Sequence, residues 1–437
     1  MATTQEPSRA RKGAGNRIGK IYADPQIGFA WLRLLSALLV VLDHSMWLPD
    51  PMRPLLILNI PVGDYALLFF FALSGYQIHD SWERDPSWWR FSARRVLRIV
   101  PPLAVVLVIT AFVIGPVFTT LPTGEYLSNG QTWAYLSMVV PFFLRGPLPG
   151  VFEHNPHNLS VNPSLWTLPM EVFGYGIVLV LGIAIAIGLH RFVLPAVLGG
   201  LLIVQGIYDA TLGEYDSGGF LGVMPMALLV KFMIAFMSGV ALHAFRHKIA
   251  VRPRYALALV VAWLVIHEVF MPDATAVPGG TAGNDGSIFR LVTLDHWLLG
   301  VAAAYTMITL GRHWPKRLEK TRRWVYGSYG AYIWGAPLQQ MFIALGVTTG
   351  WVLLLIAAPS AYLVGLASWH LVELPTQKLR RYLNARQLPM TGPTPRPDYE
   401  PAPVEPAPTE PALTEQTLTE QAPTKQSMPL ATEKTNG

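Results

Sequence analysis

GFAWLRLLSALLVVLDHSMW, residues 28–47, is the stretch that decides the fold class of this chain. Its length suits a helix that crosses a bilayer, because about 20 residues rising ~1.5 Å each span a hydrocarbon core ~30 Å thick. It nevertheless contains Arg33, Asp43 and His44, and ionisable side chains in a spanning helix normally face a protein interior or a water-filled cavity. The stretch therefore predicts a transmembrane helix with a polar face.

Arg33 and His44 are eleven residues apart, which is about three helical turns. They therefore share one face of the helix and are separated by roughly 16 Å along its axis. A fixed cation near one membrane surface and a titratable imidazole near the other indicate a reaction path through the membrane. The alternative is that Arg33 extends to the lipid headgroups and His44 caps a helix end in wet surroundings.

The composition of the whole chain is typical of a polytopic α-helical membrane protein. Of its 437 residues 52% are hydrophobic and 14% are charged, with a mean hydropathy of +0.36, whereas soluble domains carry about 25% charged residues. The chain has no cysteine, which excludes disulfides, thiolate metal sites and Cys nucleophiles. Membrane proteins collect Lys and Arg in cytoplasmic loops, so the net charge of +6 does not indicate a nucleic-acid partner.

We expect about ten transmembrane helices, with both termini in the cytoplasm. The expected location is the plasma membrane. A further apolar piece, 132–145, is too short to span and is expected to be re-entrant or interfacial. Lys and Arg gather in connections 80–98, 245–254 and 312–323, which the positive-inside rule places in the cytoplasm. The candidate spans are 28–47, 59–79, 97–118, 166–189, 192–209, 221–244, 254–271, 288–311, 325–346 and 349–373.

Composition divides the chain into three parts. Residues 1–27 are basic and are expected to be disordered, residues 28–387 form the membrane domain, and residues 388–437 are rich in Pro, Thr and Glu. The last part contains a loose five-residue repeat and few residues that could be buried in a core, so we expect a disordered cytoplasmic tail. We assign the tail no chemistry; a docking segment for a cytoplasmic partner is the alternative.

Ionisable residues also gather in the predicted outer half of the membrane domain, where each is unfavourable in lipid. Interfacial positions are the alternative, most of all for Asp64, His267 and Glu268. We expect Asp43, Asp295 and His296 to contact the substrate. The residues of this group are Asp43, His44, Asp64, Glu171, His267, Glu268, Asp295 and His296.

Two further segments carry candidate functional residues. RFSARRVLRIVPP places Arg95 and Arg98 at i and i+3, where two guanidiniums on one helix face could bind a phosphate. Ordinary positive-inside anchoring is the alternative. In NPSLWTLPMEV, residues 162–172, two prolines bracket an aromatic turn that could present Glu171 to a cavity.

Six segments together resemble acyltransferase family 3, membrane proteins that modify surface polysaccharides and lipids. They run in order from about residue 28 to 381, which is most of the chain before the tail. One departure is that many relatives have a histidine where this chain has Gly335, so the role of that histidine is absent or taken by another residue such as His296. The matching segments are Arg33 and His44 as R-x10-H, FFALSGYQI at 70–78, RRVLRIVPP at 94–102, PSLWTLPMEV ending at 172, SYGAYIWGAP at 328–337 and VELP at 372–375.

The resemblance implies O-acyl transfer from cytoplasmic acyl-CoA, with acetyl the expected group, to a hydroxyl of a cell-surface glycan or glycolipid. Arg33, Arg95 and Arg98 would bind the anionic donor. His44 would be the general base, because a neutral imidazole can take the hydroxyl proton. Asp43 is adjacent and points about 100° away, so Glu171 from another helix is expected to orient the imidazole.

The resemblance also places Ser74 and Trp166 in matching segments, and we expect both to contact the substrate. No metal or permanently bound cofactor is expected: His154 and His157 are separated by Pro156, and no other set of metal ligands is convincing. The competing function is a secondary transporter or flippase of a lipid-linked sugar, which would also use charges near the midplane. No correspondence between the two halves of the chain supports that alternative.

Overall fold

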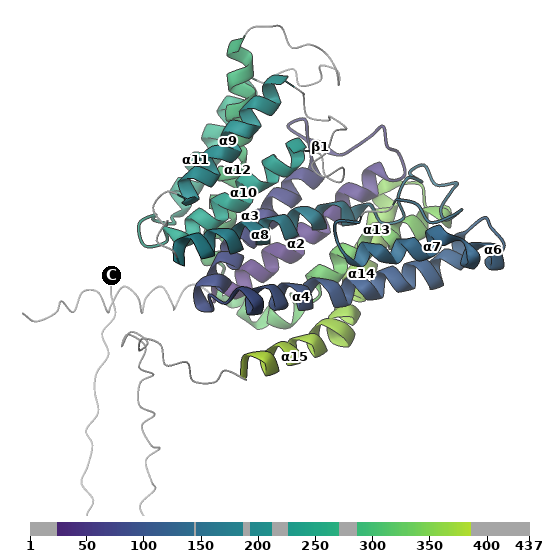
Figure 1. Cartoon of the computed structure of the whole chain (residues 1–437). Coiled ribbons are helices and arrows are strands. Elements are labelled where there is room, and N and C mark those ends of the chain that lie inside the picture. The colour runs from purple at the N-terminus through teal and green to yellow at the C-terminus, as the bar shows by residue number, and fades with distance from the viewer. Residues whose placement is uncertain (1–23, 144–145, 187–192, 212–225, 271–285, 386–437) are drawn as a thin grey trace, which may run out of the picture. The chain divides into compact units, whose positions relative to one another are not determined.

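The computed structural model describes residues 24–143, 146–186, 193–211, 226–270 and 286–385, and these ranges are helical almost throughout (Figure 1). The strands within them are β1 (Leu56–Ile57) and β2 (Ile60–Pro61), which pair as a short antiparallel hairpin. The prediction of a mainly helical protein is confirmed. The predicted tail, and the predicted N-terminal segment up to residue 23, lie outside the described residues.

Where the structure describes them, the candidate spans are helical over most of their length, although 97–118 comprises α4, η1 and α5, and 349–373 comprises α14 and η5. In chain order the helices are α2 (Pro25–Trp47), α3 (Val62–Arg84), α4 (Trp88–Ile109), η1 (Thr110–Ile114), α5 (Gly115–Phe118), α6 (Thr123–Ser128), α7 (Gly130–Ala134), η2 (Tyr135–Val139), η3 (Pro163–Thr167), α8 (Leu168–Ala186), α9 (Val193–Thr211), α10 (Met226–Ala244), α11 (Pro253–Phe270), α12 (Gly286–Arg312), η4 (Lys316–Trp324), α13 (Ser328–Ala344), α14 (Gly350–Ser368), η5 (Trp369–Glu373) and α15 (Leu374–Ala385).

Within the described ranges, four helical stretches are long and apolar enough to cross a membrane: Pro25–Trp47, Trp88–Phe118, Pro163–Ile185 and Gly350–Leu379. They support a membrane protein, whereas the count of ten spans remains a prediction. The segment expected not to cross, 132–145, begins in α7 and η2, which are together only a few turns long.

Local sequence explains where α2 begins. The side chain of Asp24 caps the helix by accepting a hydrogen bond from the backbone N–H of Gln26 at 3.0 Å. Pro25 occupies the first helical position, where a missing N–H is not needed. The helix then continues without a break to Trp47. Arg33 and His44 therefore lie on the same helix.

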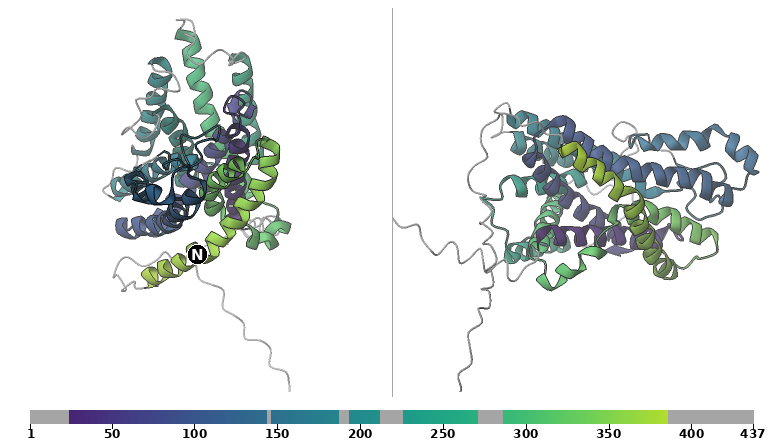
Figure 2. Two further views of the ribbon diagram at one scale, coloured as in Figure 1. Left: turned by 90° about the vertical axis from the view of Figure 1, so that its right-hand side faces the viewer. Right: turned by 90° about the horizontal axis from the view of Figure 1, so that it is seen from below.

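Helix α2 packs against α3, α12, α13 and α14 and so lies within the bundle (Figures 1 and 2). The closest approach in the bundle is between α3 and α10. A Cβ at Gly75 would overlap the carbonyl oxygen of Phe236, and one at Gly239 would overlap that of Ala72. Small residues that let two backbones meet in this way are typical of helix pairs in membranes.

Candidate active site

His44 lies in the last turn of α2 and is buried, with 6% of its surface exposed. Its Nδ1 lies 3.4 Å from the hydroxyl oxygen of Ser164, which stands in η3. Trp47 packs edge-on against the imidazole with ring centroids 5.4 Å apart, and His157 packs edge-on against Trp47 at 4.7 Å. The imidazole is therefore surrounded by groups from α2, η3 and the loop that precedes η3.

That loop is fixed to α13 by buried amide side chains. Asn155 donates to the Oε1 of Gln340 at 2.7 Å, and Asn162 donates to a backbone carbonyl of α13 at 2.8 Å. In the same helix Gln339 donates to the hydroxyl of Ser45 at 2.7 Å, and so joins α13 to the last turn of α2. These bonds hold the surroundings of the imidazole in place, because a buried amide without its partners would be costly.

Arg33 lies near the other end of α2, in a group of charges from α4 and α8. It is within electrostatic range of Arg98 and of Glu171, and Glu171 also accepts a short hydrogen bond from the hydroxyl of Tyr175. Among the described residues, the Nε of Arg33 is buried without a hydrogen-bond partner. The guanidiniums of Arg33, Arg95 and Arg98 outnumber the nearby carboxylates of Glu171 and Glu373, and an anionic ligand could balance the excess positive charge.

A cavity of about 390 Å³ opens beside this group. The parallel rings of Tyr326 and Trp369 lie in its wall, with centroids 4.9 Å apart and an angle of 11° between the rings. Such a flat aromatic wall suits stacking with a planar ring. The charged residues that line the cavity are Arg33, Arg94, Arg98, Arg322 and Glu373.

Arg95 does not line this cavity. It lies beside a second cavity of about 280 Å³, where its guanidinium is 5.1 Å from the ring centroid of Phe91 and 5.5 Å from that of Tyr175. Arg95 and Arg98 thus line different cavities, and their joint binding of a phosphate remains a prediction. Positions three apart differ by roughly 60° around a helix, and residues of α8, including Tyr175, line the second cavity beside Arg95.

A family model described as an acyltransferase domain matches residues 26–370, well over half of the chain and including α2, η3 and the arginines of α4. The chain belongs to acyltransferase family 3. The resemblance seen in the sequence is therefore confirmed.

Two known proteins are similar to this acyltransferase-family chain. An O-acetyl transferase of Shigella phage Sf6 is 32% identical over 158 residues, which are 36% of this chain and 45% of the phage protein. Nodulation protein 10 of Rhizobium leguminosarum bv. viciae is 26% identical over 379 residues, which are 82% of this chain and 95% of that protein. The match thus spans less than half of the phage protein and nearly all of the nodulation protein. No solved structure matches this chain.

In this acyltransferase-family chain Glu171 does not contact His44. Both residues lie in the described ranges, and no hydrogen bond or ion pair joins them there; Glu171 is instead bonded to Tyr175 and faces Arg33. The contact expected to orient the imidazole is made by Ser164. The sequence placed Glu171 near an outer helix end beside His44, but Glu171 lies within electrostatic range of Arg33, about three turns away from His44 along α2.

Asp43 turns away from His44, as its adjacent position requires. Its Oδ1 accepts from the backbone N–H of Gly63 at 2.9 Å, and its Oδ2 accepts from the indole of Trp47 at 3.1 Å. The carboxylate therefore joins the end of α2 to the start of α3. Its predicted contact with substrate remains a prediction.

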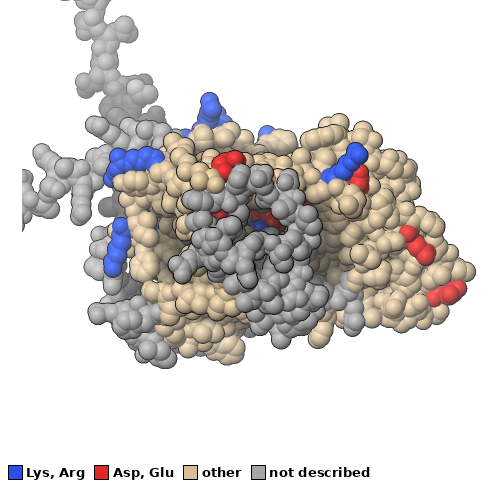
Figure 3. Space-filling model, turned by 90° about the horizontal axis from the view of Figure 1, so that it is seen from above, with Lys and Arg blue, Asp and Glu red and all other residues tan. Residues whose placement is uncertain are grey.

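Of the other ionisable residues of the predicted outer group, Asp64, His267 and Asp295 form ion pairs, whereas Glu268 is exposed. Lys231 of α10 lies 2.9 Å from the carboxylate of Asp64, and the Nδ1 of His267 lies 3.2 Å from that of Asp295. His296 is partly buried on α12. Seen from above, the described surface is mainly uncharged, with a few acidic and basic side chains (Figure 3). Pairing explains how these charges are tolerated, while a role in substrate binding is untested.

Ser74, Trp166 and Gly335 are positions that the family motifs singled out. Ser74 is buried on α3, and its hydroxyl has no hydrogen-bond partner among the described residues. Trp166 packs at 6.3 Å from the ring of Phe232. A Cβ at Gly335 would lie 2.9 Å from the side chain of Val41, so glycine here lets α13 approach α2 closely.

Sequence reasoning missed several residues of this site. Arg322 was counted only as a cytoplasmic charge, and the aromatic wall of the cavity joins residues from two distant segments. One feature of the sequence could have indicated the aromatic wall. Tyr326 lies just before the motif at 328–337, and Trp369 lies just before the motif at 372–375. The missed residues are Arg94, Ser164, Arg322, Tyr326, Trp369 and Glu373.

Proposed function

We propose that this protein is an integral membrane O-acyltransferase. It moves an acyl group, with acetyl the expected one, from cytoplasmic acyl-CoA to a hydroxyl of a cell-surface glycan or glycolipid. The observation that supports this most directly is that α2 carries Arg33 at an arginine-lined cavity and, three turns on, His44 in a buried site. Family membership and the printed name of the phage relative support acyl transfer to oxygen.

In this proposal the cavity binds the nucleotide part of the donor. The phosphates lie against Arg33, Arg98 and Arg322, because guanidinium groups bind phosphate with paired, charge-assisted hydrogen bonds. The adenine ring stacks on the wall formed by Tyr326 and Trp369. The pantetheine arm then follows α2 towards His44 and carries the thioester to the buried site.

His44 acts as the general base. Its imidazole takes the proton of the acceptor hydroxyl while the hydroxyl oxygen attacks the thioester carbonyl carbon. The tetrahedral intermediate collapses by breaking the carbon–sulfur bond, and the imidazolium returns the proton to the departing thiolate. The products are an O-acyl ester and free CoA, so no redox step is required.

Ser164 fixes the imidazole for this step. When Nδ1 carries the proton and donates to the Ser164 hydroxyl, the lone pair of Nε2 is free to accept the substrate proton. Glu171 serves the donor end: it partly balances the charges of Arg33 and Arg98 and so keeps both guanidiniums in place when no donor is bound.

The proposal includes an arrangement in the membrane. Ten spans with both termini in the cytoplasm place the arginine cavity at the cytoplasmic face of the plasma membrane and His44 towards the other side. Residues 28–387 are the catalytic membrane domain. The segment before α2 and residues 388–437 take no part in the reaction, although the latter could bind a cytoplasmic partner.

The test is release of free CoA by the purified protein. A thiol reagent can follow CoA directly, because the chain contains no cysteine of its own. Acetyl-CoA and a delipidated extract of surface glycans are supplied to the protein in detergent, and acylated glycan is measured by mass spectrometry. A transporter or flippase would release no CoA under these conditions, and that result would overturn the proposal.

A further inference from the structure

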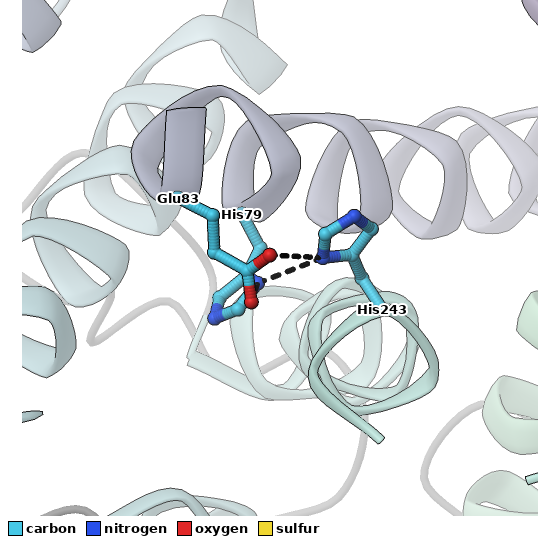
Figure 4. Close-up of side chains that lie close together, drawn as sticks. All are labelled: His79, Glu83 and His243. Carbon is cyan, nitrogen blue, oxygen red and sulfur yellow. Dashed lines mark hydrogen bonds and ion pairs between the residues drawn. The ribbon is translucent and has the colours of Figure 1, made fainter. Parts of the chain in front are cut away.

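Two histidines and a glutamate converge at one end of the contact between α3 and α10 (Figure 4). His79 and Glu83 lie one turn apart on α3, and His243 lies in the last turn of α10. The two Nδ1 atoms are 3.0 Å apart, and oxygens of Glu83 lie 3.8 Å from the Nδ1 of His79 and 3.9 Å from that of His243. Both histidines are buried, at 5% and 4% exposed, whereas the carboxylate of Glu83 closes the group on the side that meets solvent.

A second carboxylate holds the far side of His243. The Oδ1 of Asp80 lies 3.4 Å from the Nε2 of His243. A carboxylate in this position keeps the proton on Nε2 and leaves the lone pair of Nδ1 directed at His79 and Glu83. Histidines that bind metals typically donate their other ring N–H to a carboxylate in this way.

The separations fit a shared ion. Two imidazole nitrogens bound to one zinc at ~2.0–2.1 Å lie roughly 3–3.4 Å from each other, and the two Nδ1 atoms are 3.0 Å apart. The carboxylate of Glu83 is 37% exposed and would complete the set by a small rotation of its side chain. Two imidazoles and one carboxylate suit zinc and similar transition ions, whereas Mg²⁺ and Ca²⁺ prefer oxygen ligands.

We propose that His79, His243 and Glu83 bind one Zn²⁺-like transition metal ion, with water as the fourth ligand. The ion joins α3 to α10 at the end of the contact in which Gly75 meets Phe236. Its role is structural, since none of the three ligands lines the arginine cavity. The two histidines are 164 positions apart in the chain, so spacing along the sequence could not reveal them.

Arg246 completes the surroundings of the site. Its Nη1 donates to both oxygens of Glu83, at 3.1 and 2.9 Å, and holds the carboxylate over the two imidazoles. Each carboxylate oxygen has a further lone pair that can face the ion. The metal-free alternative is a single N–H···N hydrogen bond between His79 and His243, which makes no use of Asp80 or Glu83 and gains nothing from zinc.

Zinc titration of the chelator-treated, desalted full chain in detergent separates these alternatives. The protein is purified without a polyhistidine tag, and bound metal is measured by elemental analysis after a second desalting. We expect one zinc per chain and a higher Tm with zinc than without it. The double variant His79→Gln, His243→Gln should bind no zinc and show no zinc-dependent change of Tm, whereas His247→Gln, at an exposed position, should behave as wild type.

Asp80→Asn should bind zinc in the same stoichiometry with affinity lowered about 10- to 100-fold. A wild-type chain that retains no zinc at micromolar concentrations would overturn the proposal, and this measurement stands even if the double variant does not fold. Equal zinc binding by the folded double variant and the wild type would overturn it as well. An equal rise of Tm with Mg²⁺ would overturn the assignment of the metal.

Discussion

The hydroxyl of Ser164 lies 3.4 Å from the Nδ1 of His44, and it occupies the position in which a carboxylate was expected. The backbone carbonyl of Ser164 accepts a hydrogen bond from Tyr332 of α13 at 2.7 Å, so the serine is itself fixed. A neutral hydroxyl holds the ring without adding a charge beside it. Because catalytic hydrogen bonds are often long without substrate, the 3.4 Å separation is compatible with a bond that shortens when the acceptor binds.

His44→Ala should bind acyl-CoA and fail to transfer its acyl group. Loss of a general base typically lowers the rate by ~10²–10⁴-fold, while the arginine cavity lies about three turns away and is unchanged. Single-turnover transfer and donor affinity are measured separately on the purified variants. His154→Ala, at an exposed position of the same loop as His157, is the matched control and should be active. If folded His44→Ala transferred the acyl group at the wild-type rate, His44 would not be the general base.

Ser164→Ala and Glu171→Gln should affect different kinetic parameters. Loss of one hydrogen bond to the imidazole should lower kcat by roughly 2- to 10-fold in Ser164→Ala with little change in the donor KM. Glu171→Gln should mainly change the donor KM, because Glu171 faces Arg33 and Arg98. The measurement is steady-state kinetics with varied acyl-CoA. If Glu171→Gln lowered kcat alone, Glu171 would act at the base after all.

The sequence predicted the helices well because their signal is local. Apolar runs of sufficient length determine where each helix lies, and the candidate spans are helical over most of their described length. The first span was expected to begin at residue 28, whereas α2 begins three residues earlier, at Pro25, after the cap formed by Asp24. Its polar positions followed from helical periodicity, which places Arg33 and His44 on one face without knowledge of any other helix.

The contacts between helices could not be predicted in the same way. Whether Glu171 meets His44 or Arg33 depends on the depth at which α8 begins beside α2, and the separation of Arg95 from Arg98 depends on which helices flank α4. Hydropathy carries no information on either point. The family motifs identified most of the candidate site residues and implied a role for each. They did not indicate which residues each one contacts.

Arg98→Lys should weaken donor binding more than Arg95→Lys does. Arg98 lines the arginine cavity, and replacing its planar fork by an ammonium loses paired hydrogen bonds to phosphate, so we expect a donor Kd roughly tenfold higher. Arg95 lies over Phe91 and Tyr175 beside the second cavity, so its replacement should change donor Kd less. Isothermal titration with CoA compares the two. Equal effects would indicate that both arginines reach the donor.

Single cysteines should report the arrangement in the membrane, since the native chain has none. Glu153→Cys, in the loop before η3, should react with an impermeant maleimide in intact cells. Lys248→Cys, in a basic connection, should react only after the membrane is opened. Both positions are exposed, so access does not depend on unfolding. The reverse labelling pattern would contradict the proposed orientation, and labelling of both in intact cells would contradict the number of spans.

Asp85→Asn should weaken donor binding although Asp85 does not line the cavity. Its carboxylate bonds Arg90 at 2.6 Å and also accepts from Arg94, whose guanidinium lines the arginine cavity and is otherwise held by backbone carbonyls. Loss of a charge-assisted bond worth about 1.5 kcal/mol or more should let Arg94 move, which corresponds to roughly tenfold in donor affinity. The readout is donor KM, with kcat unchanged because His44 is not involved.

The pH dependence gives an independent check on Asp85. Hydrogen bonds from Arg90, and then those from Arg94, lower the pKa of the Asp85 carboxyl below its ordinary value. A carboxylate with a lowered pKa stabilises the folded state above its unfolded pKa of about 3.9, and that contribution is lost as pH falls through the lower folded pKa. Wild type should therefore lose stability in acid below about pH 4 more steeply than Asp85→Asn, as measured by thermal unfolding in detergent. If the stability of the two proteins fell equally as the pH was lowered, the Asp85 carboxylate would hold neither Arg90 nor Arg94.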